Sequence, residues 1–180
     1  MAQVYKRVAL IGLGLIASSM CHAMRRAGLA GEIVGYAKSA ASRDIARAIG
    51  LCDTVYDSAA EATKDADLVV LCVPVGAMEQ VAREIAPALK PGATVSDVGS
   101  VKRNVVEVVS PHIPDGVHFI PAHPLAGTEH SGPRSGFAEL FDNRFCIIVP
   151  GENADRAAVD RLADFWRGMG AQIDEMDAEH

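Results

Sequence analysis

The residues best suited to chemistry lie in a segment rich in Pro and Gly, residues 121–136. It contains three Gly and two His, and it has no sustained helical or strand period. We therefore expect a long loop, and such loops often carry functional residues. His123 lies between two prolines there, and a neutral His near its ordinary pKa suits removal of the proton of a substrate hydroxyl. Glu129, six residues further on, could orient a His or a substrate hydroxyl.

A second polar segment, residues 97–102, follows a predicted strand at the edge where open α/β sheets bind ligands. Ser100 could belong to the binding site, or it could cap the helix that follows. A metal site formed by His123, Glu129 and His130 is not expected, because their spacing matches no helical pair of metal ligands.

A glycine-rich turn near the N-terminus indicates a cofactor. Residues 12–17 fit the pattern GxGxxA, directly after a predicted strand and at the start of a predicted helix. The first Gly permits a tight turn, the second lets a pyrophosphate approach the backbone, and the small last residue lets helix and strand pack closely. The free N–H groups at the start of the helix favour phosphate. The residues expected to bind the dinucleotide are Gly12, Leu13, Gly14, Leu15, Ile16 and Ala17.

The end of the second predicted strand indicates which nicotinamide cofactor to expect. An NAD site usually carries Asp or Glu there, which accepts hydrogen bonds from the ribose hydroxyls. Residues 33–37 end without an acid. The polar residues that follow could hold a 2′-phosphate or could form a solvated helix start: Lys38, Ser39, Ser42 and Arg43. We expect NADP, with NAD as the alternative. The ends of the next two strands are also expected to line the cofactor site, at Val73, Pro74 and Asp97.

Alternating strands and helices must position these groups. Apolar, β-branched runs predict strands at residues 7–12, 32–36, 67–73, 93–98, 117–120, 144–149 and 171–174. Helical periodicity predicts helices at 15–27, 41–49, 76–89, 101–109 and 154–169. Strands that are apolar on both faces and alternate with helices predict a Rossmann-like, doubly wound, mainly parallel sheet with helices on both faces. We expect one dinucleotide-binding domain over residues 1–174.

Composition narrows the class further. The 180 residues, 49% of them hydrophobic, suffice for one globular domain. Seventeen basic and 23 acidic residues give a net charge of −6, which argues against nucleic acid as a partner. No stretch has the length and apolar character of a membrane span. The four cysteines show no CxxC pair. The apolar run at residues 8–17 resembles a signal peptide, but Gly12 and Gly14 interrupt it. We therefore expect a cytoplasmic protein.

The motifs together resemble the prephenate dehydrogenase family, also called arogenate or cyclohexadienyl dehydrogenase. The resemblance is carried in order by DVGSVK (97–102), HPLAGTEHSGP (123–133), the pair at 140–141 and CIIVP (146–150). It extends from residue 6 to about residue 176, and HPLAGTEHSGP is its most specific part. One departure is Ala17, where the family usually has a third Gly.

The resemblance implies NAD(P)-dependent oxidative decarboxylation of prephenate or arogenate, to 4-hydroxyphenylpyruvate or tyrosine. It implies that His123 bonds the ring hydroxyl, that Ser100 assists it and the nicotinamide, and that Glu129 is an acid of the substrate pocket. Family members continue into a helical domain that completes the substrate site and forms a homodimer. We therefore expect residues 175–180 to begin a linker to such a domain, and this chain alone to bind cofactor with little turnover.

Two alternatives remain open at this point. Another Rossmann dehydrogenase, acting on a hydroxy acid or an imine, would share the glycine turn but has no need of HPLAGTEHSGP. A regulatory module could bind NADP without turnover.

Overall fold

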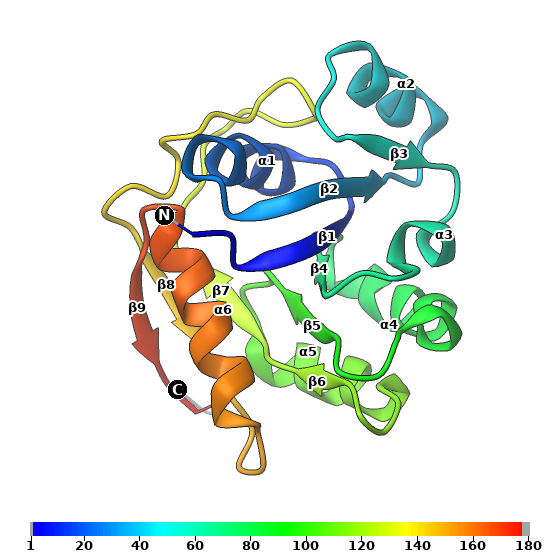
Figure 1. The fold of residues 1–180 in the computed structure, drawn as a ribbon. Coiled ribbons are helices and arrows are strands. Elements are labelled where there is room, and N and C mark those ends of the chain that lie inside the picture. The colour runs from blue at the N-terminus through cyan, green and yellow to red at the C-terminus, as the bar shows by residue number, and fades with distance from the viewer. Residues whose placement is uncertain (1, 178–180) are drawn as a thin grey trace.

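The computed structural model describes residues 2–177, and its centre is a six-stranded parallel sheet (Figure 1). The strands are β1 (Tyr5–Ile11), β2 (Ala30–Tyr36), β3 (Thr54–Tyr56), β4 (Leu68–Leu71), β5 (Thr94–Asp97) and β6 (His118–Phe119). Their order is β3-β2-β1-β4-β5-β6, and all pairings are parallel. This is the doubly wound order of Rossmann domains, so the predicted fold class is confirmed.

Helices follow the strands, and five of the six match predicted helices. They are α1 (Leu15–Ala27), α2 (Ala40–Ala48), α3 (Ala59–Thr63), α4 (Val75–Ile85), α5 (Lys102–Val109) and α6 (Arg156–Gly168). Two short 3-10 turns, η1 (Ala86–Ala88) and η2 (Ser110–His112), extend α4 and α5. The helix predicted over 76–89 ends early because Pro87 has no N–H group to continue it.

The sheet separates two hydrophobic cores, and β1 contributes to both. Val8 and Leu10 pack with α1 and α6 on one face, whereas Ala9 and Ile11 pack with α3, α4 and α5 on the other. Successive side chains of a strand point to opposite faces, so a strand buried on both sides reads as a continuous apolar run. The central strand is thereby fixed in place, and with it the glycine turn at its end.

A second, three-stranded sheet stands beside α6, with the order β7-β8-β9 (Figure 1). Its strands are β7 (Ala122–Pro124), β8 (Phe145–Ile148) and β9 (Gln172–Glu175). β7 runs antiparallel to β8, and His123 lies opposite Ile147. The expectation of an unbroken loop over residues 121–136 is therefore wrong at its start, because three residues of that segment pair with a strand more than twenty residues away.

Two further elements were not predicted, β3 and α3. The signal for α3 is the pair Ser58 and Glu61, because the Ser58 hydroxyl accepts a hydrogen bond from the Glu61 N–H at 3.1 Å and caps the helix. At the other end of the chain, the domain boundary predicted after residue 174 falls within β9. Of the predicted linker, residues 178–180 lie outside the described residues.

Candidate active site

The glycine turn joins β1 to α1 in contact with the ends of two neighbouring strands. Gly12 has a φ of +103°, and a Cβ added there would lie 2.7 Å from the carbonyl oxygen of Cys72. Its N–H donates to the Tyr36 carbonyl at the end of β2, over 2.7 Å. Because both the backbone angle and the contact exclude a side chain, only Gly fits this position.

Gly14 is needed for a different reason. It is the N-cap of α1 and makes no side-chain capping bond, and a Cβ added there would meet nothing within 4 Å. The first turn of the helix carries no acidic residue, so the positive end of the helix dipole and the free N–H groups there are not compensated by a negative side chain. The site fits a pyrophosphate in this way. Leu13 and Ala17 are buried in the core beneath, and Leu15 and Ile16 are half-buried.

Ala17 is completely buried where the family pattern has a third glycine. Its methyl group is accommodated in the core that includes Met20 and Leu10. The substitution therefore leaves the close packing of α1 on β1 intact.

At the end of β2, two of the four residues expected to hold a 2′-phosphate have side-chain partners within the protein. The Ser39 hydroxyl accepts from the Ser42 N–H at 3.3 Å and caps α2. The Arg43 guanidinium donates to the carbonyls of Ala37 and Lys38 at 2.7 and 2.9 Å, and its Nε lies 3.2 Å from Asp57. Lys38 itself is exposed.

The end of β4 borders the point where the strand order reverses, between β1 and β4. Val73 lies against the glycine turn, with its Cγ1 3.1 Å from the position of a Cβ added to Gly12. Pro74 is exposed and forms the N-cap of α4. Open α/β sheets bind their ligands in the crevice at this reversal, where both residues lie.

At the end of β5, Asp97 and Lys102 form a buried ion pair. Their side chains are 0% and 8% exposed. Burial raises the pKa of Asp97 and lowers that of Lys102, and in each case the opposite charge acts against this effect. The Asp97 carboxylate accepts from the Gly99 N–H at 2.9 Å and from the Ala122 N–H at 3.2 Å. Because the Asp97 carboxylate has no exposed surface, it binds groups within the protein rather than making the direct cofactor contact that the sequence suggests.

Ser100 is exposed at the same edge of the sheet. α5 begins at Lys102 with Val101 as its N-cap, and no side chain caps it. The alternative role of Ser100 as a helix cap is therefore wrong, and the exposed Ser100 lies between the two residues of the buried pair in the sequence.

His123 is half-buried on β7. Burial lowers the pKa of its imidazole, the ammonium of Lys102 lowers it further, and the carboxylate of Asp97 acts in the opposite direction. The net effect favours the neutral imidazole near pH 7, which is the form that can accept a proton.

Glu129 lies apart from this cluster. Its side chain is 85% exposed, and its Oε1 lies 3.4 Å from the Nε2 of His130. The loop that carries it is anchored further along, where the Phe137 N–H donates to the Ser19 hydroxyl of α1 at 3.2 Å. The structure thus brings His123, Asp97 and Lys102 together and places Glu129 outside them. Lys102 is the member of the cluster that the sequence analysis missed.

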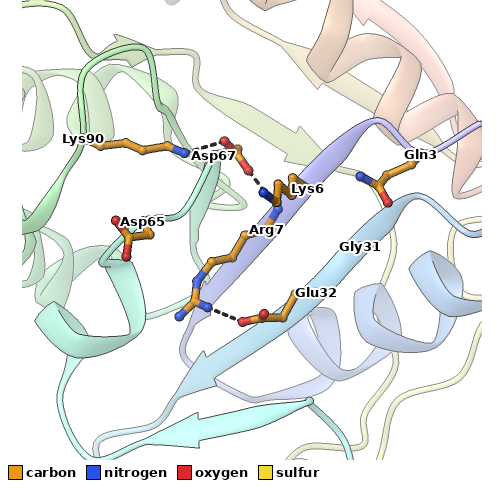
Figure 2. A pocket seen from close by; sticks show the side chains of 8 residues that line it. All are labelled: Gln3, Lys6, Arg7, Gly31, Glu32, Asp65, Asp67 and Lys90. Carbon is orange, nitrogen blue, oxygen red and sulfur yellow. Dashed lines mark hydrogen bonds and ion pairs between the residues drawn. The ribbon is translucent and has the colours of Figure 1, made fainter.

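A hollow of about 600 Å³ lies at the opposite edge of the sheet (Figure 2). Its lining residues come from the starts of the strands and their neighbours: Gln3, Lys6, Arg7, Gly31, Glu32, Asp65, Asp67 and Lys90. Arg7 is paired with Glu32, and the Lys90 Nζ donates to Asp67 over 2.7 Å. Much of the charge in this hollow is therefore compensated locally.

Within residues 2–177, no group of three or more His, Cys, Asp or Glu side chains is arranged to hold a metal ion. Across the same residues, no helix has the length and apolar character needed to cross a membrane.

A parallel sheet with reversed strand order, a glycine turn leading into an uncapped helix and a half-buried His at the same edge define a Rossmann-type, dinucleotide-binding domain. Comparison with known proteins specifies the family. Residues 20–175 match the family described as prephenate dehydrogenase, nucleotide-binding domain. The chain belongs to the prephenate dehydrogenase family.

Individual relatives agree with this assignment. The cyclohexadienyl dehydrogenase of Zymomonas mobilis is 44% identical over 98% of this chain, and the prephenate dehydrogenase of Bacillus subtilis is 31% identical over 99%. The crystal structure of prephenate dehydrogenase from A. aeolicus, in complex with hydroxyphenyl propionate and NAD+, matches 97% of the chain with a TM-score of 0.88 and 28% identity. The chain spans 60%, 48% and 60% of the lengths of these three proteins, respectively.

Proposed function

We propose that the protein containing this chain catalyses the NAD(P)-dependent oxidative decarboxylation of prephenate or arogenate, in tyrosine biosynthesis. The observation that carries the proposal is His123, which is half-buried on β7 at the edge that also bears the glycine turn, where burial lowers its pKa and favours the proton-accepting form. Membership of the family supports the substrate class. The products are 4-hydroxyphenylpyruvate from prephenate and tyrosine from arogenate, with CO2 in both cases.

Different residues of the chain have different roles in the reaction. The bound nicotinamide supplies the acceptor for a hydride from the ring carbon that carries the hydroxyl. The free N–H groups at the start of α1 would hold the pyrophosphate of the cofactor. His123 takes the hydroxyl proton as the C–H bond breaks, and Ser100 assists it, as the family resemblance implies. Loss of CO2 returns an electron pair to the ring, which becomes aromatic, and the proton returns to the phenol oxygen.

For the cofactor we propose a preference for NADP. The residues after β2, from Tyr36 to Ser39, include no acid that would accept from the ribose hydroxyls. Lys38 is exposed, and the Arg43 guanidinium lies at the same turn through its bonds to the carbonyls of Ala37 and Lys38. These two cations are the groups that a 2′-phosphate would meet. NAD remains the alternative.

We further propose that Glu129 contributes to the substrate pocket, and that the enzyme is a cytoplasmic homodimer formed through the helical domain of the family. The four cysteines of this chain are all free, which suits a reducing compartment. The exposure of Glu129 leaves its carboxylate available to substrate or to another part of the enzyme.

The decisive experiment is steady-state oxidation of prephenate and arogenate, each with NAD and NADP. It is carried out on the native protein, with whatever residues follow His180. We expect oxidation of at least one substrate, with the higher kcat/KM for NADP. If neither substrate is oxidised while a nicotinamide cofactor binds, the proposal fails, and the site belongs to another dehydrogenase or to a regulatory module.

A further inference from the structure

The ion pair of Asp97 and Lys102 holds both backbone polar groups of one residue, Ala122. The Asp97 Oδ1 accepts from the Ala122 N–H at 3.2 Å, and the Lys102 Nζ donates to the Ala122 carbonyl at 2.7 Å. Lys102 also donates to the other oxygen of Asp97, which closes a ring of interactions. Ala122 immediately precedes His123 on β7.

These bonds replace a missing neighbouring strand. β7 is an edge strand of its sheet. The Val149 N–H donates to the Pro121 carbonyl at 2.9 Å, and the Leu125 N–H donates to the Phe145 carbonyl at 2.8 Å. Since alternate residues of an antiparallel strand face the same neighbour, Ala122 turns its N–H and carbonyl away from β8. Ala122 is completely buried, so water does not satisfy these groups, and the ion pair does.

The same pair also acts electrostatically on His123. Lys102 lowers the pKa of the imidazole and Asp97 raises it, and Lys102 has the larger effect of the two. These are the charged groups that act on the ring in the described structure. The pair thus favours the neutral imidazole while it holds the adjacent backbone.

We propose that Asp97 and Lys102 are positioning residues that fix the edge of β7 at Ala122 and thereby the place of the His123 imidazole relative to the cofactor. This inference rests on the proposed function for its effect on turnover. Neither residue touches substrate or cofactor in this account, since both side chains are buried.

A similar pair at the opposite edge of the sheet provides the control. The Lys90 Nζ donates to the Asp67 Oδ1 at 2.7 Å, and the Asp67 Oδ2 accepts from the Arg7 N–H at 2.9 Å. This pair also joins an Asp next to a central strand to a Lys and to a backbone N–H. Its side chains are 40% and 20% exposed, so it is less buried than the pair of Asp97 and Lys102, and Lys90→Met removes an Asp–Lys pair at the other edge without touching the site.

The test compares Lys102→Met, Asp97→Asn/Lys102→Met and Lys90→Met in the native protein. The double variant removes both buried charges, so it avoids the penalty of leaving one charge unpaired. For each variant we would measure cofactor affinity, kcat, substrate KM, and the titration of the His123 ring by NMR.

We expect both Lys102 variants to bind cofactor normally and to lose roughly 10- to 100-fold in kcat, the scale of effect produced by a displacement of about 1 Å. Substrate KM should change little, and in Lys102→Met the His123 ring should titrate at higher pH. Lys90→Met should match the wild type in all four measurements.

Three results would overturn the inference. One is a wild-type kcat in either Lys102 variant that binds cofactor. Another is an equal loss in Lys90→Met. The third is loss of cofactor binding in both Lys102 variants, which would make the pair a folding element. If the wild-type protein oxidises neither substrate, the proposed function fails by itself. The pH at which the His123 ring titrates can then be compared between Lys102→Met and Lys90→Met. This comparison still decides whether the pair of Asp97 and Lys102 controls the protonation of the imidazole.

Discussion

The parallel sheet has charged residues at both its amino edge, where the strands begin, and its carboxyl edge, where they end. The two edges differ in which polar groups remain accessible to a ligand. At the amino edge, Arg7 pairs with Glu32 and Lys90 pairs with Asp67 around an open hollow (Figure 2). At the carboxyl edge, the buried pair of Asp97 and Lys102 holds the backbone of the adjacent strand.

The difference shows that a hollow lined by charges is not by itself a binding site. At the carboxyl edge, other polar groups beside the buried pair remain available to a ligand. These groups are the N–H donors at the start of α1, the exposed hydroxyl of Ser100 and the half-buried imidazole of His123. At the amino edge, two of the cations are paired with neighbouring acids, so each is less available to bind a ligand.

The largest expected effect is on His123. In the native protein, His123→Asn should lower kcat by roughly 10²- to 10⁴-fold, the usual contribution of a general base, with cofactor affinity unchanged. In the wild type, kcat/KM should fall only below the ordinary pKa range of His, because burial lowers the pKa of His123 and the neutral form persists to lower pH. Steady-state rates across pH measure both effects. An unchanged rate in the variant would remove His123 from the mechanism.

Substitutions at the two glycines of the turn should affect cofactor affinity and stability separately. In Gly14→Ala the added methyl meets no protein atom within 4 Å, so stability should hold. Cofactor affinity should fall about 10- to 100-fold if the methyl costs one hydrogen bond to phosphate. In Gly12→Ala the positive φ and the contact with Cys72 should lower the free energy of unfolding by about 1–3 kcal/mol or more. Thermal denaturation and cofactor titration distinguish the two variants; equal stability losses would contradict the account.

The loop that carries Glu129 should respond to a change at its anchor on α1. A Cβ added to Gly136 would lie 2.5 Å from the carbonyl carbon of Ser18, so Gly136→Ala should displace the loop that carries Glu129. We expect substrate KM to rise several-fold with little change in cofactor affinity. A variant with unchanged KM would show that the position of this loop does not matter to the substrate.

A modest effect on the choice of cofactor is expected at the end of β2. Replacing Lys38 and Arg43 together with Ala should weaken NADP by about tenfold and NAD much less, since two partly exposed contacts contribute up to about 1 kcal/mol each. Affinities for both cofactors, measured on the same preparation, test this expectation. An equal loss for NADP and NAD would reject the 2′-phosphate site.

The smallest effect belongs to the amino edge. The side chains of Arg7 and Glu32 are 19% and 44% exposed. Glu32→Gln breaks this pair, so the free energy of unfolding should fall by about 0–1 kcal/mol. Turnover and cofactor affinity should match the wild type. A marked loss of either would mean that the hollow in Figure 2 takes part in function and would break the contrast between the edges.

Much of the fold could be predicted because its determinants are local. α1 has the predicted bounds, and Gly28 ends it with a φ of 66°. The glycine turn follows β1 as expected, since its pattern lies within six consecutive residues. The capping signal of Ser58 and Glu61 was also local, and attention to it would have revealed α3.

The remainder of the site depends on contacts between distant segments. The pairing of His123 with Ile147 and the hydrogen bond from Lys102 to Ala122 join residues 20 or more positions apart. Hydrophobic periodicity cannot report such contacts, and for that reason β7 was predicted as loop and Lys102 was overlooked. Asp97 was assigned to the cofactor for its place at a strand end, but its burial gives it a partner inside the protein.

The central claim is that cofactor and catalytic His share the carboxyl edge of the sheet. The most direct measurement is the change in backbone amide and His ring NMR shifts of the protein on titration with NADP and with NAD. The account predicts that the largest changes fall on Gly12, Gly14 and His123, with those at Arg7, Glu32 and Lys90 close to zero. The largest changes at the amino edge, with the glycine turn unaffected, would contradict it.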